Sequence, residues 1–162
     1  MYSGLEPIID KLLAEISANL AAELAVRAAL VPALAMPAPA AAEYTFGERQ
    51  IHTTYPAIEI FPVTTPIDKD NNESLTLWHN VGIAIFVRAP KEENLTRLLL
   101  RYADAVIQVI ANRRAAGAFN GLFSLDMNEQ TLDWSPTRVA QRTLLERDVM
   151  FAVRCMKTES RS

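Results

Sequence analysis

The segment 64–74 carries the densest set of possible oxygen ligands in this chain. Asp68, Asp70 and Asn72 stand at alternate positions, which is how an EF-hand loop begins to hold Ca²⁺. An EF-hand also needs glycine at its sixth position and glutamate at its twelfth, where this chain has Glu73 and His79. The flanking segments are predicted to be strands rather than helices. The pattern favours a solvated hairpin tip, with a low-affinity cation site as the alternative.

Nucleophilic and metal-binding side chains are few and scattered. The spacing of Cys155, His52 and His79 does not suggest a zinc site. Cys155 stands in an apolar run, where we expect a small buried hydrophobe, and His79 interrupts the apolar face of a predicted strand, where a hydrogen-bonded histidine is ordinary. The sequence has no G-x-S-x-G turn and no glycine-rich phosphate loop. We therefore predict no catalytic residue, metal site or cofactor, and a chain that is not an enzyme.

The composition is that of a globular chain. With 162 residues, half of them hydrophobic, the chain is long enough for one domain with a substantial core. The formal net charge of -3 argues against a dedicated nucleic-acid binder. One cysteine allows no intrachain disulfide, which favours a reducing compartment. Charged residues and three prolines interrupt the apolar segment 20–42, so we predict neither a signal peptide nor a membrane span.

A long strand followed by a long helix is the clearest structural pattern. Residues 74–88 alternate, and one face collects Leu75, Leu77, Val81, Ile83, Ile85 and Val87. An amphipathic helix is predicted to start with the segment Ala89-Pro-Lys-Glu-Glu93 and to run to about Gly117, the expected residue just beyond its end. A further strand is predicted over 144–156. One face of that strand is apolar and the other is mixed, which fits a sheet covered by helices on one side and partly by a neighbouring subunit on the other.

The N-terminal third combines a helix with proline-rich connections. A helix is predicted from a capping box at Ser3 and Glu6 to about Ala29. Residues 31–42 are rich in alanine and proline, so we expect an exposed arm, either a flexible linker or one that orders against a neighbouring subunit. Proline residues bracket the predicted strand 55–63, which should therefore be short or lie at a sheet edge.

These elements predict a single α+β domain over residues 1–157, followed by a polar tail at 158–162. We expect a mostly antiparallel or mixed sheet, with the N-terminal helix and the long central helix packed on one face. The Ala/Pro segment 31–42 and the hairpin tip 64–74 would extend from this domain.

Four segments follow one another in the order of a known protein family. They are Tyr55-Pro-Ala-Ile-Glu-Ile60, Trp78-His-Asn-Val-Gly-Ile-Ala-Ile85, Leu98-Leu-Leu-Arg-Tyr-Ala-Asp-Ala-Val106 and Arg147-Asp-Val-Met-Phe-Ala-Val-Arg154. With the preceding helix, their order and rhythm resemble the tail terminator, or tail completion, proteins of tailed bacteriophages. The resemblance is spread over residues 1–157 and includes no short diagnostic motif. The Ala/Pro segment 31–42 does not map onto the family pattern.

The resemblance implies a structural virion protein, made in the host cytoplasm. Such proteins form a hexameric ring that caps the tail tube, stops its polymerisation and presents a surface to the head connector. The implied partners are further copies of the chain, tube protein, connector or neck proteins and, in contractile tails, sheath protein. DNA would pass through the lumen without specific binding, and no membrane is involved. The alternatives are a head-side neck or stopper protein and another small α+β interaction module.

Candidate interface residues come from the arm, the hairpin tip and the predicted central helix. Arginine outnumbers lysine in this chain and is favoured at protein interfaces, although a solvated surface would also explain it. The candidates are Pro32, Met36, Pro37, Pro39, Ile67, Asp68, Lys69, Asp70, Asn71, Asn72, Glu73, Arg97 and Arg101.

Overall fold

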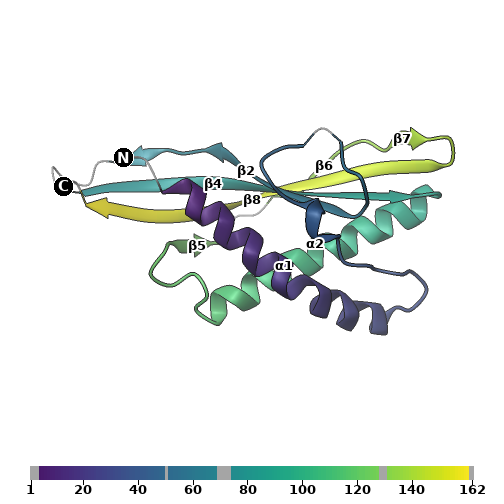
Figure 1. Cartoon of the computed structure of the whole chain (residues 1–162), viewed down its shortest axis with the longest axis horizontal. Helices are drawn as coiled ribbons and strands as arrows, with labels where there is room; N and C mark the ends of the chain where they lie inside the picture. The colour runs from purple at the N-terminus through teal and green to yellow at the C-terminus, as the bar shows by residue number, and fades with distance from the viewer. Residues whose placement is uncertain (1–3, 50, 69–73, 128–130, 161–162) are drawn as a thin grey trace.

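The computed structural model describes residues 4–49, 51–68, 74–127 and 131–160. Within these residues, two long helices and a mixed sheet of eight strands form an α+β domain (Figure 1). Both helices lie on the same side of the sheet, and the core fills the space between them and the sheet. The predicted fold class is confirmed.

Two long strands form the centre of the sheet. Strand β4 (Ser74–Ala89) and strand β8 (Leu144–Ser160) pair antiparallel along their full lengths, from Ser74 opposite Ser160 to Ala89 opposite Leu145. The long strand predicted at 74–88 is confirmed. Strand β8 continues past residue 157, where the domain was predicted to end, and into the predicted polar tail. The reason is that its backbone pairs with β4 whether its side chains are polar or apolar.

The remaining strands are short and flank this central pair. Strand β2 (Ala57–Thr64) lies beside β4, and strand β1 (Tyr44–Phe46) pairs parallel with β2. Strand β3 (Ile67–Asp68) also pairs with β4. Three strands follow one another along the outer edge of β8. They are β5 (Ser124–Asp126), β6 (Asp133–Trp134) and β7 (Arg138–Gln141).

The prolines around strand β2 predicted that it would be short or lie at a sheet edge, and the edge position is not what the structure shows. The strand has eight residues and lies between β1 and β4. Strand β1 pairs only with residues 58–60, so Pro62 lies beyond that pairing. A proline is tolerated in β2 because the strand is flanked on both sides over only part of its length.

Each helix buries one face against the sheet. Helix α1 (Leu5–Leu30) begins after Gly4, and the predicted capping box depends on Ser3, which lies outside the described residues. Helix α2 (Glu92–Ala115) ends as predicted, with Gly117 in the left-handed region at φ 77°. The Gly117 N–H donates to the Arg114 carbonyl and the Ala118 N–H to the Arg113 carbonyl, which is the Schellman pattern. Among the described residues, no helix is long and apolar enough to cross a membrane.

The segment after α1 packs against the body of the domain. Met36 and Pro39 are buried, and the Tyr102 hydroxyl of α2 donates to the Pro37 carbonyl. The prediction of an exposed arm is therefore wrong at Met36 and Pro39. The physical reason is that the apolar Met36 joins the core and the buried tyrosine needs an acceptor for its hydroxyl. A short 3-10 helix, η1 (Ala41–Glu43), then leads into β1.

Candidate interaction surface

Side chains at alternate positions of β4 and β8 form a face that points away from the helices. We call this surface the open face. Directly opposed pairs build it, and they are Trp78 with Met156, Asn80 with Arg154, Gly82 with Ala152, Ala84 with Met150, Phe86 with Asp148 and Arg88 with Glu146. The intervening residues point into the core. The mixed second face predicted for the closing strand is this surface.

The middle of the open face is apolar and shallow. Phe61 of β2 lies over Gly82, and the adjacent Val63 keeps 46% of its surface exposed. Phe61 also lines a groove of about 290 Å³. Its other lining residues include Ala84, Phe86 and Met150. Glu48, Arg49 and Asp148 contribute charges of both signs to the same groove, and the buried Glu59, opposite Ala84, also lines it. A combination of apolar side chains with charged ones around them is typical of protein-binding surfaces.

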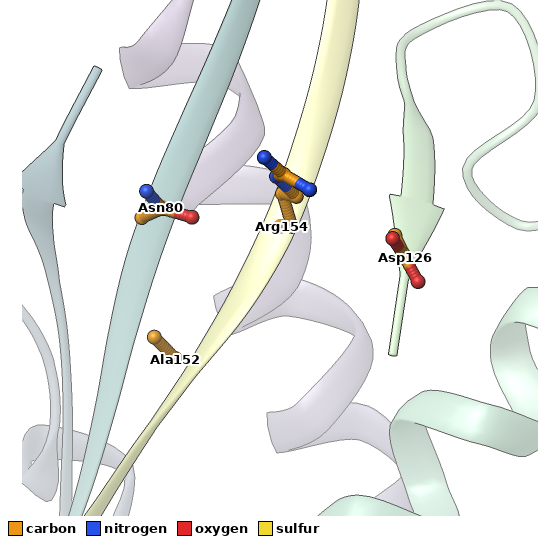
Figure 2. A pocket seen from close by; sticks show the side chains of 4 residues that line it. All are labelled: Asn80, Asp126, Ala152 and Arg154. Carbon is orange, nitrogen blue, oxygen red and sulfur yellow. The ribbon is translucent and has the colours of Figure 1, made fainter. Parts of the chain in front are cut away.

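Polar side chains surround a hollow of about 200 Å³ at one end of the open face. Figure 2 shows Asn80 on β4, Arg154 on β8 and Asp126 on β5 across three neighbouring strands, with Ala152 further along β8. The guanidinium carbon of Arg154 lies 4.6 Å from the ring centre of Trp78. The Asn80 amide donates to the Thr64 hydroxyl at 2.7 Å. Arginine and tryptophan are the side chains most enriched at binding hot spots.

An ion-pair network occupies the other end of the open face. Glu146 accepts from Arg88 at 3.0 Å and from Arg138 at 2.7 Å, and Arg138 also reaches Asp148 at 2.9 Å. Burial would raise the pKa of Glu146, but hydrogen bonds from Tyr55, Arg88 and Arg138 outweigh it and hold that pKa below its usual range. Arg88 also stacks on the Tyr55 ring, 4.0 Å from its centre. This network holds β7, β8 and β4 together at that end.

A buried histidine holds the segment between β1 and β2 against the sheet. His52 contacts a carboxylate through each ring nitrogen, Glu43 from Nδ1 and Glu59 from Nε2, both at 2.9 Å. Glu43 also accepts the backbone N–H groups of Thr53 and Thr54. The ring of His52 lies 5.1 Å from that of Phe86, so this segment covers part of the open face.

The histidine cluster does not have the geometry of a metal centre. Its carboxylates lie at opposite nitrogens of one ring, so the three side chains do not converge on one point. Among the described residues, no group of three or more histidine, cysteine, aspartate or glutamate side chains could hold a metal ion. This cluster could not be predicted from the sequence, because Glu43, His52 and Glu59 lie in three separate segments and form no local pattern.

The two other candidate chemical residues are buried in the core. Cys155 is fully buried, and burial raises the pKa of its thiol to about 12. His79 is also fully buried, and its Nδ1 lies 3.1 Å from the Thr65 hydroxyl. The predictions of a buried cysteine and of a hydrogen bond at His79 are confirmed, whereas His79 is fully buried instead of partly buried as expected.

The predicted interface residues do not gather in one place. Pro32 and Pro37 are exposed, whereas Met36 and Pro39 are buried within the chain. Ile67 and Asp68 form β3, opposite Leu77 and Thr76. The remaining predicted residues of the hairpin tip lie outside the described residues, and these are Lys69, Asp70, Asn71, Asn72 and Glu73.

The two predicted arginines lie on α2, which packs on the side of the sheet opposite the open face. Arg97 is exposed and pairs with Glu93 at 3.0 Å. Arg101 is partly buried, and its Nη1 has no hydrogen-bond partner within the described part of the chain. An interface role for either arginine stays a prediction.

The last turns of α1 expose an apolar surface that the sequence analysis did not single out. We call it the α1 end patch, and it comprises Ala21, Ala22, Ala25, Val26, Ala29 and Leu30. Val26 is 60% exposed and Leu30 78%. The charged residues within this stretch, Glu23 and Arg27, pair with each other at 3.0 Å, and Arg27 also reaches Asp104 of α2 at 3.9 Å. Glu23 and Arg27 are partly buried, so the exposed positions of these turns carry only apolar side chains.

No family model and no curated protein matches the chain. The fold is similar to that of a chain in the solved structure described as "Virion of native gene transfer agent (GTA) particle", with 14% sequence identity and a TM-score of 0.32. The match covers 97% of this chain and 100% of the other. This degree of likeness does not identify a function for the present chain.

Proposed function

We propose that this chain is a structural virion protein, a ring-forming tail terminator that caps the tail tube and joins the tail to the head connector. The resemblance in the order and rhythm of its sequence segments supports this role. The observation that carries the proposal furthest is the open face. This face carries a groove and the stack of Arg154 on Trp78. The helices pack on the opposite side of the sheet and leave this face open.

The proposed mechanism is steric and involves no chemical step. A ring of these subunits on the last ring of tube protein would cover the surface that the next tube subunit needs. Polymerisation would stop because the terminator does not repeat that surface on its outer side. The ring itself requires two different complementary patches on each subunit, since head-to-tail contacts close a ring and self-complementary contacts close a dimer.

The experiment combines the purified chain with the tube protein of the same virion. Native mass and negative-stain images of the chain alone and of the mixture would show whether rings form, and tube lengths would show whether growth stops. We expect rings on tube ends and tubes that no longer elongate. A chain that stays monomeric and leaves tube growth unchanged would contradict the proposal.

One charge reversal on the open face sharpens this experiment. Arg154→Glu removes the exposed guanidinium that stacks on Trp78, and we expect weaker ring formation or weaker tube capping. Arg114→Glu changes an exposed arginine at the end of α2, on the helical side, and makes the same change in net charge. Equal loss of assembly in both variants would mean that the open face has no special part in assembly.

A further inference from the structure

We infer that the α1 end patch of one subunit docks on the open face of a second copy of the chain, and that this head-to-tail contact builds the ring. The inference rests on the proposed function for its biological setting. Its structural basis is independent, because it comes from two apolar surfaces on opposite sides of the same domain.

The α1 end patch is an exposed helix surface made of apolar side chains, which in most proteins would be buried against a partner. An apolar surface on a helix is ordinarily covered, since water penalises each exposed aliphatic group. Ala22, Val26 and Leu30 follow at intervals of four residues and form one ridge along the helix. Leu24 fills the inward side and is buried. These turns are therefore apolar both toward the core and toward the outside.

The open face offers a surface of matching chemistry. Its groove includes the uncharged side chains of Ala84, Phe86 and Met150, and the buried carboxylate beside them, Glu59, is held by His52. Val63 extends the apolar area next to the groove. The adjacent charged side chains have both signs, so they can stay solvated at the rim when an uncharged ridge covers the floor. Methionine adapts its shape to a partner more readily than branched side chains do. A ridge of small aliphatic residues suits such a shallow groove.

The small size of the patch favours a closed ring over an isolated dimer. Stable interfaces use roughly 20–30 residues on each side. The patch and the exposed residues just beyond it, Val31, Pro32 and Ala33, fall well short of that number. One such contact alone would be weak. A ring gives every subunit two contacts, and a tube end adds a third surface, so assembly would be stable only when closed or templated.

The placement of the two surfaces also excludes a self-complementary contact between them. The patch belongs to the helical side of the sheet and the groove to the opposite side. When a second copy covers the groove with its patch, its own groove remains free for a third copy. The contact therefore propagates from copy to copy, and it forms a ring where the rotation between neighbouring copies closes the circle.

Cysteine cross-linking tests this pairing directly. Val26→Cys and Val63→Cys place thiols on the patch and beside the groove, both at exposed positions. A short bis-maleimide is then added to the full-length chain at high concentration and on tube ends. We expect a mixture of the two single variants to give cross-linked dimers, and the double variant to give a ladder that ends at the ring. Neither single variant alone should cross-link, and the wild-type chain serves as the blank because Cys155 is buried.

The outcomes separate this inference from the proposed function. Dimers from Val26→Cys alone would overturn the head-to-tail pairing, because they would show patch against patch. Rings or capped tubes without cross-links in the mixture would overturn the pairing and leave the tail-terminator role intact. A chain that neither self-associates nor caps tubes would overturn both.

A charge placed in the patch gives a second test that does not depend on cross-linker reach. Val26→Glu should weaken self-association by about tenfold or more, because a carboxylate would have to lose its water in the groove. Val139→Glu, at a 73% exposed position on β7, is the matched control and should leave association unchanged. Thermal melting of both variants confirms that each is folded. Unchanged association of Val26→Glu would contradict the inference.

Discussion

The ring of Phe61 covers Gly82 so closely that no larger residue fits beneath it. A β-carbon at position 82 would lie 2.5 Å from Cε2 and 2.8 Å from Cζ of Phe61. The contact joins β2 to the middle of β4 on the open face. Glycine is therefore required here by the close approach of a neighbouring side chain.

Gly82→Ala should lower the free energy of unfolding by about 1–3 kcal/mol, because the added methyl group displaces the Phe61 ring. Urea denaturation followed by circular dichroism measures the change. In a Phe61→Ala background the same substitution should cost at least about 1 kcal/mol less, since the ring that it clashes with is gone. Additive effects of the two substitutions would contradict this account.

His52→Ala should be among the most destabilising single substitutions in the chain. It removes the group that lies between the buried carboxylates of Glu43 and Glu59. A buried charged group that loses its hydrogen-bond partner costs about 1–3 kcal/mol or more, and this substitution affects two carboxylates. Chemical denaturation gives the loss of stability. Thr53→Ala, which keeps the backbone N–H that Glu43 accepts, is the control and should cost far less.

The same cluster predicts how stability depends on pH. Burial would raise the pKa of Glu43, but hydrogen bonds from His52, Thr54 and Thr53 outweigh it and hold that pKa below its ordinary value of 4.5. The contribution of Glu43 to stability is therefore complete above this value and is lost as the pH falls through the folded-state pKa. We expect the free energy of unfolding to decline below about pH 4.5, more steeply in the wild-type chain than in Glu43→Gln. Equal slopes would assign the decline to other carboxyl groups, such as Glu146.

Two substitutions test whether the segment after α1 is anchored. Tyr102→Phe removes the hydrogen bond to the Pro37 carbonyl and should cost about 0.5–1.5 kcal/mol. Met36→Ala removes a core side chain and should cost about 2–5 kcal/mol. Both variants should be cut faster by protease within residues 31–40. Ala33→Ser, at an exposed position, should change stability and cleavage little. Cleavage as fast in the wild type as in the variants would show that the segment is not held.

Cys155 should be inert in the folded chain. Its thiol is fully buried, and burial raises its pKa to about 12, so little thiolate is present at neutral pH. A chromogenic disulfide reagent should react with no thiol in buffer and with one thiol per chain in urea. The Val26→Cys variant, with its exposed thiol, is the positive control. Rapid reaction of the native chain would contradict the burial of Cys155.

Local patterns in the sequence predicted the parts of the fold that depend on neighbours along the chain. The alternation in 74–88 and in 144–156 predicted the two central strands, because a half-buried strand must place apolar residues at every second position. The end of α2 at Gly117 was also predictable, since a left-handed residue there favours glycine. The mixed face of the closing strand likewise indicated a sheet that helices cover on one side only.

Tertiary structure decided the features that depend on residues distant in sequence. Met36 is buried because α2 passes beside it, and neither the alanines nor the prolines around it indicate this. The exposed apolar surface at Val26 and Leu30 is flanked by partly buried charges, because Glu23 pairs with Arg27 and Arg27 also reaches Asp104 of α2. Glu43, His52 and Glu59 are isolated polar residues in the sequence and meet only when β1 pairs with β2. Periodicity reports which face of an element is buried, whereas the identity of what covers that face depends on the fold as a whole.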